Sequence, residues 1–363
     1  MNPSYLQIES LNLKLGNFAL KNINLSCAKC EYNVILGPTG SGKSSLMKCI
    51  LGFHRPGGGN IYFKSRTINN DLPEIRNMGY VPQNYSLFPH LDVERNIRFG
   101  LRVRKSSSDS DDRIVEKLCD ILNLQHLRKR KIHFLSGGER QKVAIARALA
   151  IQPDMLLLDE PFSSIDEGAK RNLWMEIKDI VKEIGITAFH ITHNLEEAYT
   201  MGDRLSVLIK GELLQSGLKN EIFEKPLTEN IARYLNYRNI YEGITEKSEN
   251  GTKINSQHFS IFVPQKISQG KKVCFCIRQQ DIKIIKKDCS VKEPLRRNIL
   301  TGKIVTLFPL PDSCLMTFKI KDSPGNHDFE LRFPRYLIER HDLYHGKEIK
   351  VAVLEPSIIV FDE

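Results

Sequence analysis

One eight-residue stretch constrains this chain more than any other part of its sequence. It follows the short apolar run Tyr32–Leu36 and fits the pattern G-x-x-x-x-G-K-[ST], with the residues Gly37, Pro38, Thr39, Gly40, Ser41, Gly42, Lys43 and Ser44. Glycines let the backbone curl so that successive N–H groups point at one centre, and a following helix adds its positive N-terminal end. The stretch therefore predicts a strand, a phosphate-binding loop and a helix that begins at Lys43.

A nucleoside triphosphate with magnesium is the ligand that such a loop favours. We expect the loop, together with Ser45, to bind ATP. The Lys43 ammonium would reach the β- and γ-phosphates, and the Ser44 hydroxyl would bind Mg²⁺. The alternative is a glycine-rich turn with an exposed lysine, which the two motifs that follow disfavour.

A second motif supplies carboxylates. The apolar run Met155–Leu158 has the character of a buried strand and ends in Asp159 and Glu160. A parallel sheet delivers such residues to its carboxyl edge, beside the phosphate loop. We expect Asp159 to hold Mg²⁺ directly or through water, and Glu160 to orient and deprotonate the attacking water. Taken alone, the pair is better explained as a strand that ends in an acidic turn.

The third motif opens a helix. Leu135–Gln141 reads L-S-G-G-E-R-Q and precedes the helical run Lys142–Ala150. Ser136 is a good N-cap, and two glycines, the second of them Gly138, expose backbone N–H groups at the start of a helix. A cap alone explains the serine, but it does not explain two glycines at a position where they weaken a helix.

These motifs together resemble the ATP-binding cassette family, whose other motifs also occur in order. Gln83, in Tyr80-Val81-Pro82-Gln83, resembles the Q-loop glutamine, and Asp166 lies in a stretch similar to the D-loop. His193 resembles the switch histidine. The resemblance implies that Gln83 senses Mg²⁺ and the attacking water, and that His193 contacts the γ-phosphate.

The same resemblance implies a dimer. In the family, two cassettes close head to tail with two ATP molecules between them. Each phosphate loop would then face Ser136 and Gly138 of the other copy, and Asp166 would cross the interface. Because this chain carries one cassette, a second copy of itself is the simplest partner.

Three residues depart from the family pattern. Leu15 stands where an aromatic residue usually stacks on adenine, and Phe18 is a nearby substitute, so the adenine contact stays open. Cys30 stands where glycine is frequent, and Asn194 where aspartate is usual; we expect neither to abolish hydrolysis. Cys27 and Cys30 form a C-x-x-C without a second pair at zinc spacing, so we expect a structural role.

The patterns along the chain predict two domains. Strand-like and helix-like stretches alternate to about Leu235, which indicates an α/β fold with a largely parallel sheet. We place the nucleotide-binding domain at residues 1–237, with a helical subdomain at about 85–140 that contains an exposed Ser/Asp-rich loop at Ser106–Asp112. Residues 238–363 follow as a small all-β sandwich or barrel, because short β-rich runs dominate there. These runs are Val273–Ile277, Ile282–Ile285, Ile299–Val305, Cys314–Ile320, Phe329–Phe333, Ile349–Val353 and Ile358–Phe361.

One stretch resembles importers in particular. Leu87–Ile97 is similar to the segment after the Q-loop in bacterial and archaeal importer ATPases, where the helical subdomain receives the coupling helix of a membrane permease. The apolar side chains of Leu87, Phe88 and Leu91 suit a groove for a partner helix. In the alternative reading, some of them face the core at the start of a helix.

The C-terminal part narrows the substrate by resemblance. Cys276–Ile282 is similar to a motif of importer barrels, whereas Arg297–Ile304 and Tyr234–Ile240 resemble the barrel and linker of molybdate and tungstate importer ATPases. The leading interpretation is therefore the energy-coupling ATPase of a molybdate or tungstate importer. Importers for sulfate, ferric iron, sugars or polyamines stay as alternatives.

The barrel of such relatives can bind the oxyanion and stop transport. Leu295 and Arg296 stand where the family motif has Ser and Ala, and Glu355 stands where a Lys precedes Ser357 by two residues. A lost hydroxyl and an added carboxylate weaken anion binding. We predict a barrel that senses the anion poorly or not at all, and favour a structural dimerisation module.

Bulk properties bear on partners and location. The net charge of +10 is shared by both halves of the chain, and no basic run is interleaved with aromatic residues, so we expect no nucleic-acid partner. No apolar run reaches the roughly 18 residues of a membrane span, and the N-terminus lacks the pattern of a signal peptide. We expect a peripheral protein on the cytoplasmic face of the inner membrane, held by permease subunits and served indirectly by an external substrate-binding protein.

Two rival functions belong to other classes. A soluble cassette ATPase in nucleic-acid or ribosome work commonly has two cassettes or long coiled-coil insertions, and this sequence has neither. An oxyanion-binding module with the cassette as its regulator is the second rival, and it makes ATP hydrolysis dispensable for uptake.

Overall fold

The computed structural model describes residues 4–104, 108–285 and 293–361. The chain divides into two compact units, Met1–Ile222 and Phe223–Glu363. Within the described ranges, none of the helices has the length and apolar character to cross a membrane.

The first unit is built on a six-stranded sheet in the order β10-β9-β3-β8-β7-β6, in which only β10 is antiparallel. Its strands are β3 (Tyr32–Leu36), β6 (Met78–Val81), β7 (Met155–Asp159), β8 (Thr187–Thr192), β9 (Arg204–Ile209) and β10 (Glu212–Leu218). All residues of β3, β7 and β8 are buried, because a parallel sheet has both faces covered. The predicted α/β fold with a largely parallel sheet is confirmed.

A smaller antiparallel sheet covers part of this core, in the order β2-β1-β4-β5. Its strands are β1 (Leu6–Leu15), β2 (Phe18–Cys27), β4 (Gly58–Phe63) and β5 (Arg66–Thr67). Leu46 and Ile50 of helix α1 (Lys43–Leu51) are buried in one apolar cluster with residues from both sheets, such as Leu6 and Leu157. The helix that carries the phosphate-loop lysine is therefore fixed on both sides.

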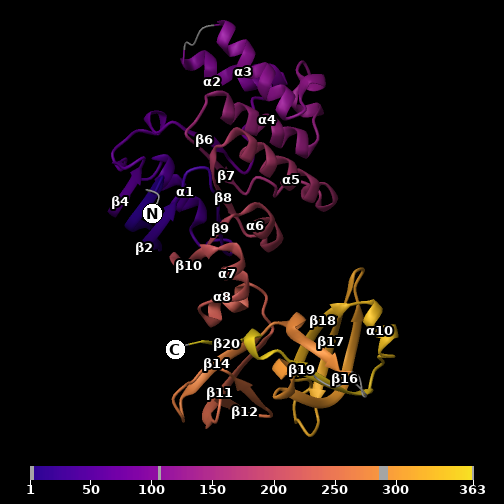
Figure 1. The fold of residues 1–363 in the computed structure, drawn as a ribbon. Helices are drawn as coiled ribbons and strands as arrows, with labels where there is room; N and C mark the ends of the chain where they lie inside the picture. The colour runs from indigo at the N-terminus through magenta and orange to yellow at the C-terminus, as the bar shows by residue number, and fades with distance from the viewer. Residues whose placement is uncertain (1–3, 105–107, 286–292, 362–363) are drawn as a thin grey trace. The chain divides into compact units, whose positions relative to one another are not determined.

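Three helices gather beyond the β6 edge of the parallel sheet, as Figure 1 shows: α2 (Val93–Arg104), α3 (Ser108–Ile121) and α4 (Gly137–Ala150). The predicted loop at Ser106–Asp112 is wrong from Ser108 onward, since α3 begins there; Ser106 lies outside the described residues. Acidic residues such as Asp111 favour the positive N-terminal end of a helix, although they show no apolar periodicity. The other helical segments of this unit are η1 (Pro73–Ile75), η2 (Gln125–Leu127), η3 (Ile132–Phe134), α5 (Glu167–Ile184), α6 (Leu195–Met201) and α7 (Lys219–Glu224), which ends in the second unit.

The second unit contains two five-stranded antiparallel sheets. The first, in the order β13-β12-β11-β14-β20, has β11 (Asn239–Ser248), β12 (Gly251–Ser256), β13 (Ser260–Val263), β14 (Lys272–Ile277) and β20 (Ile358–Phe361). The second, in the order β15-β19-β16-β17-β18, has β15 (Ile282–Ile285), β16 (Ile299–Pro309), β17 (Ser313–Ile320), β18 (Phe329–Pro334) and β19 (Glu348–Val353). Short helical segments complete the unit: α8 (Glu229–Tyr234), η4 (Gln279–Asp281), α9 (Glu293–Arg296), α10 (Tyr336–Arg340) and η5 (Glu355–Ser357).

A shared core joins these two sheets. Phe275 of one sheet and Phe318 and Phe329 of the other are fully buried in one apolar cluster. The expected small all-β domain is confirmed, and the seven predicted β-rich runs all become strands. The sequence did not predict β11, β12 and β13. The polar stretch Ser248–Ser256 contains all of β12, and Ser248 pairs with Gly251 across the turn between β11 and β12.

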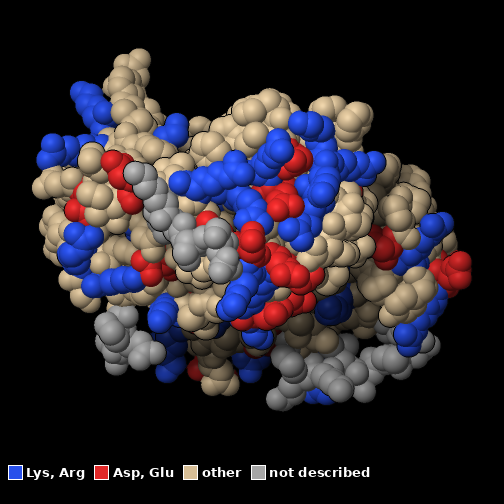
Figure 2. Space-filling model, turned by 90° about the horizontal axis from the view of Figure 1, so that it is seen from above, with Lys and Arg blue, Asp and Glu red and all other residues tan. Residues whose placement is uncertain are grey.

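Charge is mixed on the face of the molecule in Figure 2, where Lys and Arg side chains lie among Asp and Glu. On that face the excess positive charge is not gathered into a single stripe. The picture therefore gives no support to a nucleic-acid groove there.

Candidate nucleotide site

The phosphate loop has a conformation that only glycine adopts easily. Gly40 and Gly42 have φ values of +80° and +104°, in the left-handed region. A Cβ at Gly42 would lie 2.4 Å from Cζ of Phe18, and a Cβ at Gly37 would lie 2.1 Å from the carbonyl oxygen of Leu208. The loop is thus packed closely against β2 and β9, and its backbone is held in place before any ligand arrives.

Lys43 lies at the centre of this loop and is almost fully buried. Its Nζ donates to the carbonyl oxygens of Gly37 at 2.8 Å and Pro38 at 3.0 Å, and lies 4.0 Å from Oε1 of Glu160. Burial lowers the pKa of the Lys43 ammonium, and the carboxylates of Glu160 and Asp159 oppose that shift. A buried cation held by loop carbonyls is well placed to exchange them for phosphate oxygens.

Asp159 forms the second part of the site. The Ser44 hydroxyl donates to its Oδ1 at 3.2 Å, and the Tyr80 hydroxyl donates to its Oδ2 at 3.3 Å. Burial raises the pKa of the Asp159 carboxyl, and the two hydrogen bonds work against that rise. The Asp159 carboxylate and the Ser44 hydroxyl lie side by side. Both offer oxygen ligands of the kind that Mg²⁺ prefers.

Glu160 connects three further residues. Its Oε2 lies 3.2 Å from Nδ1 of His193 and accepts a hydrogen bond of 3.4 Å from Nε2 of Gln83. Its backbone has a φ of +45°, which is unfavourable for glutamate, and its N–H donates to the Ile191 carbonyl oxygen at 3.0 Å. Backbone strain of this kind persists where surrounding structure fixes a side chain for function.

The structure thus joins six of the predicted site residues through direct contacts. This phosphate-site cluster consists of Lys43, Ser44, Gln83, Asp159, Glu160 and His193. The other loop residues flank it: Thr39 is exposed, Ser45 is half-buried, and Ser41 is buried with a hydroxyl that has no hydrogen-bond partner among the residues that the structure describes. An orphaned hydroxyl in this loop is consistent with a polar ligand that is not part of the chain.

The signature residues form their own local structure. Ser136 caps α4, because its hydroxyl accepts the Glu139 N–H at 3.2 Å and the Glu139 carboxylate accepts the Ser136 N–H at 2.6 Å. Gly137 faces the loop after β7, where a Cβ would lie 3.1 Å from the Ser164 carbonyl oxygen. The capping box fixes the start of α4 against that loop.

Three predicted site residues are not brought to the cluster. Among the described residues, no hydrogen bond or ion pair joins Ser136, Gly138 or Asp166 to the phosphate-site cluster. Asp166 is exposed at the N-cap of α5 and makes no side-chain capping bond. One chain therefore presents the phosphate-binding half and the signature half of the site at separate places.

Two contacts of the site were not predicted from sequence. Tyr80 binds Asp159 because β6 lies beside β7 in the sheet, a pairing that no local pattern reveals. Phe18 packs against Gly42 beneath the phosphate loop, whereas Leu15 is 38% exposed at the end of the hairpin with β2. The sequence signal for Tyr80 was an aromatic residue three positions before Gln83.

Cys30 also has a local explanation. Its φ is +60°, in the left-handed region where glycine is favoured, and its N–H donates to the Thr187 hydroxyl at 2.9 Å. Its thiol donates to the Gly185 carbonyl oxygen at 3.0 Å. These bonds hold a strained turn before β3, and Cys27 nearby is buried within strand β2.

Substitution of Asp159 by Asn tests the charge of this site. Because the folded-state pKa of Asp159 is raised, its ionised form costs stability at neutral pH, and the cost disappears as the pH falls below the folded-state pKa. We expect Asp159→Asn to raise Tm at pH 7, because the neutral amide does not carry the cost of a buried charge. The gain should shrink toward pH 4, as calorimetry at a series of pH values will measure.

Asp154 provides a control of opposite sign. Burial alone would raise its pKa, but hydrogen bonds from Lys64 and Asn77 outweigh burial and lower the pKa. Its ionised form therefore stabilises the fold at neutral pH, and this contribution is lost as the pH falls. Asp154→Asn should lower Tm at pH 7; an equal change in both variants contradicts the charge argument.

The barrel residues singled out in the sequence lie together as well. Leu295 and Arg296 belong to α9, which contacts η5, the segment that carries Glu355 and Ser357. The Ser357 hydroxyl donates to the Leu354 carbonyl oxygen at 2.7 Å. The neighbourhood predicted for an anion thus contains a leucine and a carboxylate.

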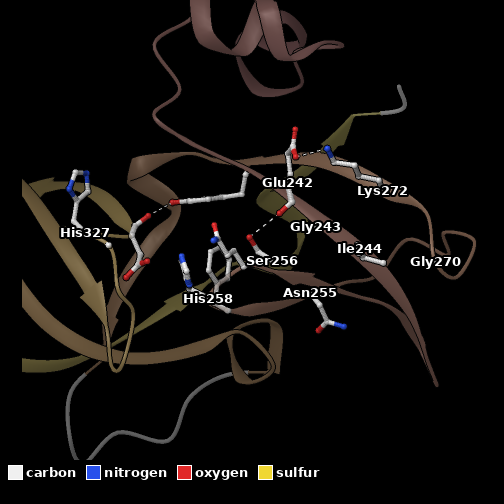
Figure 3. Close-up of a pocket in the computed structure, with 14 residues that line it drawn as sticks. Glu242, Gly243, Ile244, Asn255, Ser256, His258, Gly270, Lys272 and His327 are labelled. Atoms are coloured by element: carbon white, nitrogen blue, oxygen red, sulfur yellow. Dashed lines mark hydrogen bonds and ion pairs between the residues drawn. The ribbon is translucent and has the colours of Figure 1, made fainter.

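A separate pocket of about 810 Å³ opens elsewhere in the second unit. Figure 3 shows its ion pair between Glu242 and Lys272, and the bond from the Ser256 hydroxyl to the Glu242 carbonyl oxygen. His258 and His327 also line it. Neither α9 nor η5 contributes to this pocket.

Comparisons with known proteins agree with the site. The family model described as ABC transporter matches residues 20–163. The molybdate/tungstate import ATP-binding protein WtpC of Pyrococcus abyssi is 36% identical over 98% of this chain and 100% of its own length. The spermidine/putrescine import ATP-binding protein PotA of Borreliella afzelii is 39% identical over 75% of this chain and 78% of its own.

A solved structure extends the comparison to the fold. It is the dimeric, post-hydrolysis state of an ATP-binding cassette bound to ADP and Pi. It is 28% identical, with a TM-score of 0.52 over 59% of this chain and 98% of its own. The fold and the site define a phosphate-loop ATPase. The chain belongs to the ATP-binding cassette family of transporter ATPases.

Proposed function

We propose that this ATPase drives the import of molybdate or tungstate through a membrane permease. The observation that carries the proposal is the match to a molybdate/tungstate import protein along nearly the whole chain, which includes the β-rich second unit. Polyamine import proteins also match, but the first of them covers 75% of this chain. The longer match therefore favours the oxyanion.

The phosphate-site cluster suggests how each residue contributes to hydrolysis. Lys43 would exchange its loop carbonyls for β- and γ-phosphate oxygens, and Glu160 would take a proton from the attacking water. Ser44 and Asp159 would hold Mg²⁺, which neutralises charge on the phosphates. Gln83 and His193 contact Glu160 and would orient it toward the γ-phosphate.

A second copy of the chain would complete the site. Ser136, Gly138 and Asp166 lie apart from the phosphate-site cluster of their own chain, and a head-to-tail pair brings them to the other copy's ATP. The solved dimeric cassette with ADP and phosphate supports such a pair. The pair would sit on the cytoplasmic face of the membrane, held by permease subunits that an external binding protein supplies.

Uptake by a strain that lacks the gene tests the substrate. We expect the wild-type chain to restore accumulation of molybdenum or tungsten, measured by mass spectrometry, and Glu160→Gln to fail. Uptake of labelled sulfate and spermidine by the same strains provides the comparison. Loss of spermidine uptake alone would make this a polyamine importer, and uptake that persists with Glu160→Gln would overturn the importer proposal.

The barrel should be a poor anion sensor. Leu295 supplies no hydroxyl and Glu355 adds a negative charge close by, so titration calorimetry of the whole protein should give a Kd above ~1 mM for molybdate, tungstate and sulfate. The double variant Leu295→Ser/Glu355→Lys should bind more tightly. Micromolar binding by the wild-type chain would show that these two residues do not spoil the site.

A further inference from the structure

Arg147 on helix α4 holds the turn that directly follows Gln83. One guanidinium nitrogen donates to the Tyr85 carbonyl oxygen at 2.8 Å, and another donates to the Ser86 carbonyl oxygen at 2.6 Å. The same guanidinium lies 5.5 Å from the centre of the Phe88 ring. Two parallel bonds from one planar group fix orientation as well as distance, which a lysine does not do.

Arg147 has no acidic partner within the described part of the chain. It is partly buried, and this burial lowers its pKa without any carboxylate to offset the effect. The Arg147 guanidinium has exchanged water for two backbone carbonyls and the face of one ring. It therefore does not stabilise the fold through an ion pair. Its contacts indicate that it holds a segment in place.

The turn that Arg147 binds has an unusual backbone conformation and is closed by backbone hydrogen bonds. Tyr85 and Ser86 have φ values of +62° and +45°, so two consecutive residues that are not glycine lie in the left-handed region. The Tyr85 N–H donates to the Pro82 carbonyl oxygen at 2.9 Å, and the Ser86 N–H donates to that of Asn84 at 2.7 Å. The turn is thus closed by its own backbone bonds beside Gln83 and held on α4 by Arg147.

Helix α2 joins the same assembly through Phe88. The side chain of Asn96 accepts the Phe88 N–H at 2.9 Å and donates to the Phe88 carbonyl oxygen at 3.1 Å. The ring of Phe88 lies 4.2 Å from that of Phe99, centre to centre. The turn, α2 and α4 are therefore tied together.

We propose that Arg147 is a positioning residue that couples Gln83 of the phosphate-site cluster to Ser136 of the same chain. Gln83 reaches Glu160 at one end of the turn, and Arg147 holds its other end on α4. Ser136 caps that same helix about 16.5 Å away, at 1.5 Å per residue. A shift of Gln83 on ATP binding thus displaces Ser136, which serves the other copy's ATP. The proposal rests on the head-to-tail pair described above.

A double-mutant cycle tests this role. Arg147→Met keeps the apolar stem but removes both bonds, and should lower kcat about tenfold while it changes the affinity for a fluorescent ATP analogue less than about twofold. Gln83→Ala should also lower kcat. If Arg147 acts through the turn, Gln83→Ala/Arg147→Met will be no slower than the slower single variant. A merely structural role predicts that the two losses multiply.

Two further variants decide the remaining cases. Arg147→Lys keeps the charge but not the two-bonded fork, so its kcat should stay close to that of Arg147→Met; full rescue by lysine overturns the proposal. Arg171→Met removes an exposed arginine of α5 that pairs with Glu196, and should leave kcat unchanged. If Arg147→Met folds poorly, the cycle is run with Arg147→Lys. Multiplied losses there also overturn the coupling.

The ATPase activity of the wild-type chain distinguishes a failure of the Arg147 proposal from a failure of the proposed function. If purified wild-type protein shows no ATPase activity with Mg²⁺, the proposed function itself is contradicted. If it hydrolyses ATP and both Arg147 variants match its kcat within twofold, only the coupling role fails.

Discussion

Glu160→Gln is expected to bind ATP and to hydrolyse it at least ~10²-fold more slowly than the wild-type chain, the loss that removal of a general base gives. Glutamine keeps the shape of Glu160 and can still accept hydrogen bonds from Gln83 and His193, so the cluster should stay assembled. It cannot take a proton from water. Phosphate release at saturating MgATP measures the loss, and a fluorescent ATP analogue measures binding.

ATP should also stabilise the dimer of this variant, because the closed state is no longer consumed by hydrolysis. Light scattering with and without MgATP measures this effect. Glu196→Gln, an exposed carboxylate of α6 that pairs with Arg171, is the matched control and should keep the wild-type rate. A Glu160→Gln rate within tenfold of wild type would assign the base to another group.

The phosphate-site cluster could be predicted because its signals are local. The conformation around Gly42 depends on neighbours in sequence. The strand that ends at Asp159 is an apolar run, and such a run predicts a buried strand. The contact of Tyr80 with Asp159 could not be predicted, since it depends on β6 pairing with β7 across a long stretch of sequence. The grip of Arg147 on Ser86 was missed for the same reason.

In the second unit, apolar strands could be predicted from the sequence but polar strands could not. Strands such as β14 are buried and apolar, and their sequences predict them. Strand β11 carries exposed polar residues and is held by pairing with β12 and β14, with Asn239 opposite Ile277.

The start of α3, in the first unit, could not be predicted from apolar periodicity, because the first turn of the helix from Ser108 has none. Tertiary pairing and helix electrostatics, rather than hydrophobic pattern, decide these elements.

Gly37→Ala should both destabilise the first unit and abolish tight ATP binding. The added Cβ would lie 2.1 Å from the Leu208 carbonyl oxygen and 2.8 Å from Oγ of Ser41. Leu208 belongs to β9, whose backbone is fixed by parallel pairing with β3, so the loop must move instead. Such overpacking costs about 3 kcal/mol, which lowers Tm by roughly 6–12 °C.

Displacement of this loop also reaches the lysine. The Gly37 carbonyl oxygen accepts a hydrogen bond of 2.8 Å from the Lys43 ammonium. A loop that shifts by about 1 Å would therefore carry Lys43 away from the phosphates of ATP. The rise in Tm that MgATP gives the wild-type chain should therefore be lost. Gly168→Ala, where a Cβ meets nothing within 4 Å in the first turn of α5, should keep the wild-type Tm or raise it slightly. If Gly37→Ala retained both Tm and the MgATP shift, the backbone of β9 would have to yield. The close contact between loop and sheet would then not be what shapes the site.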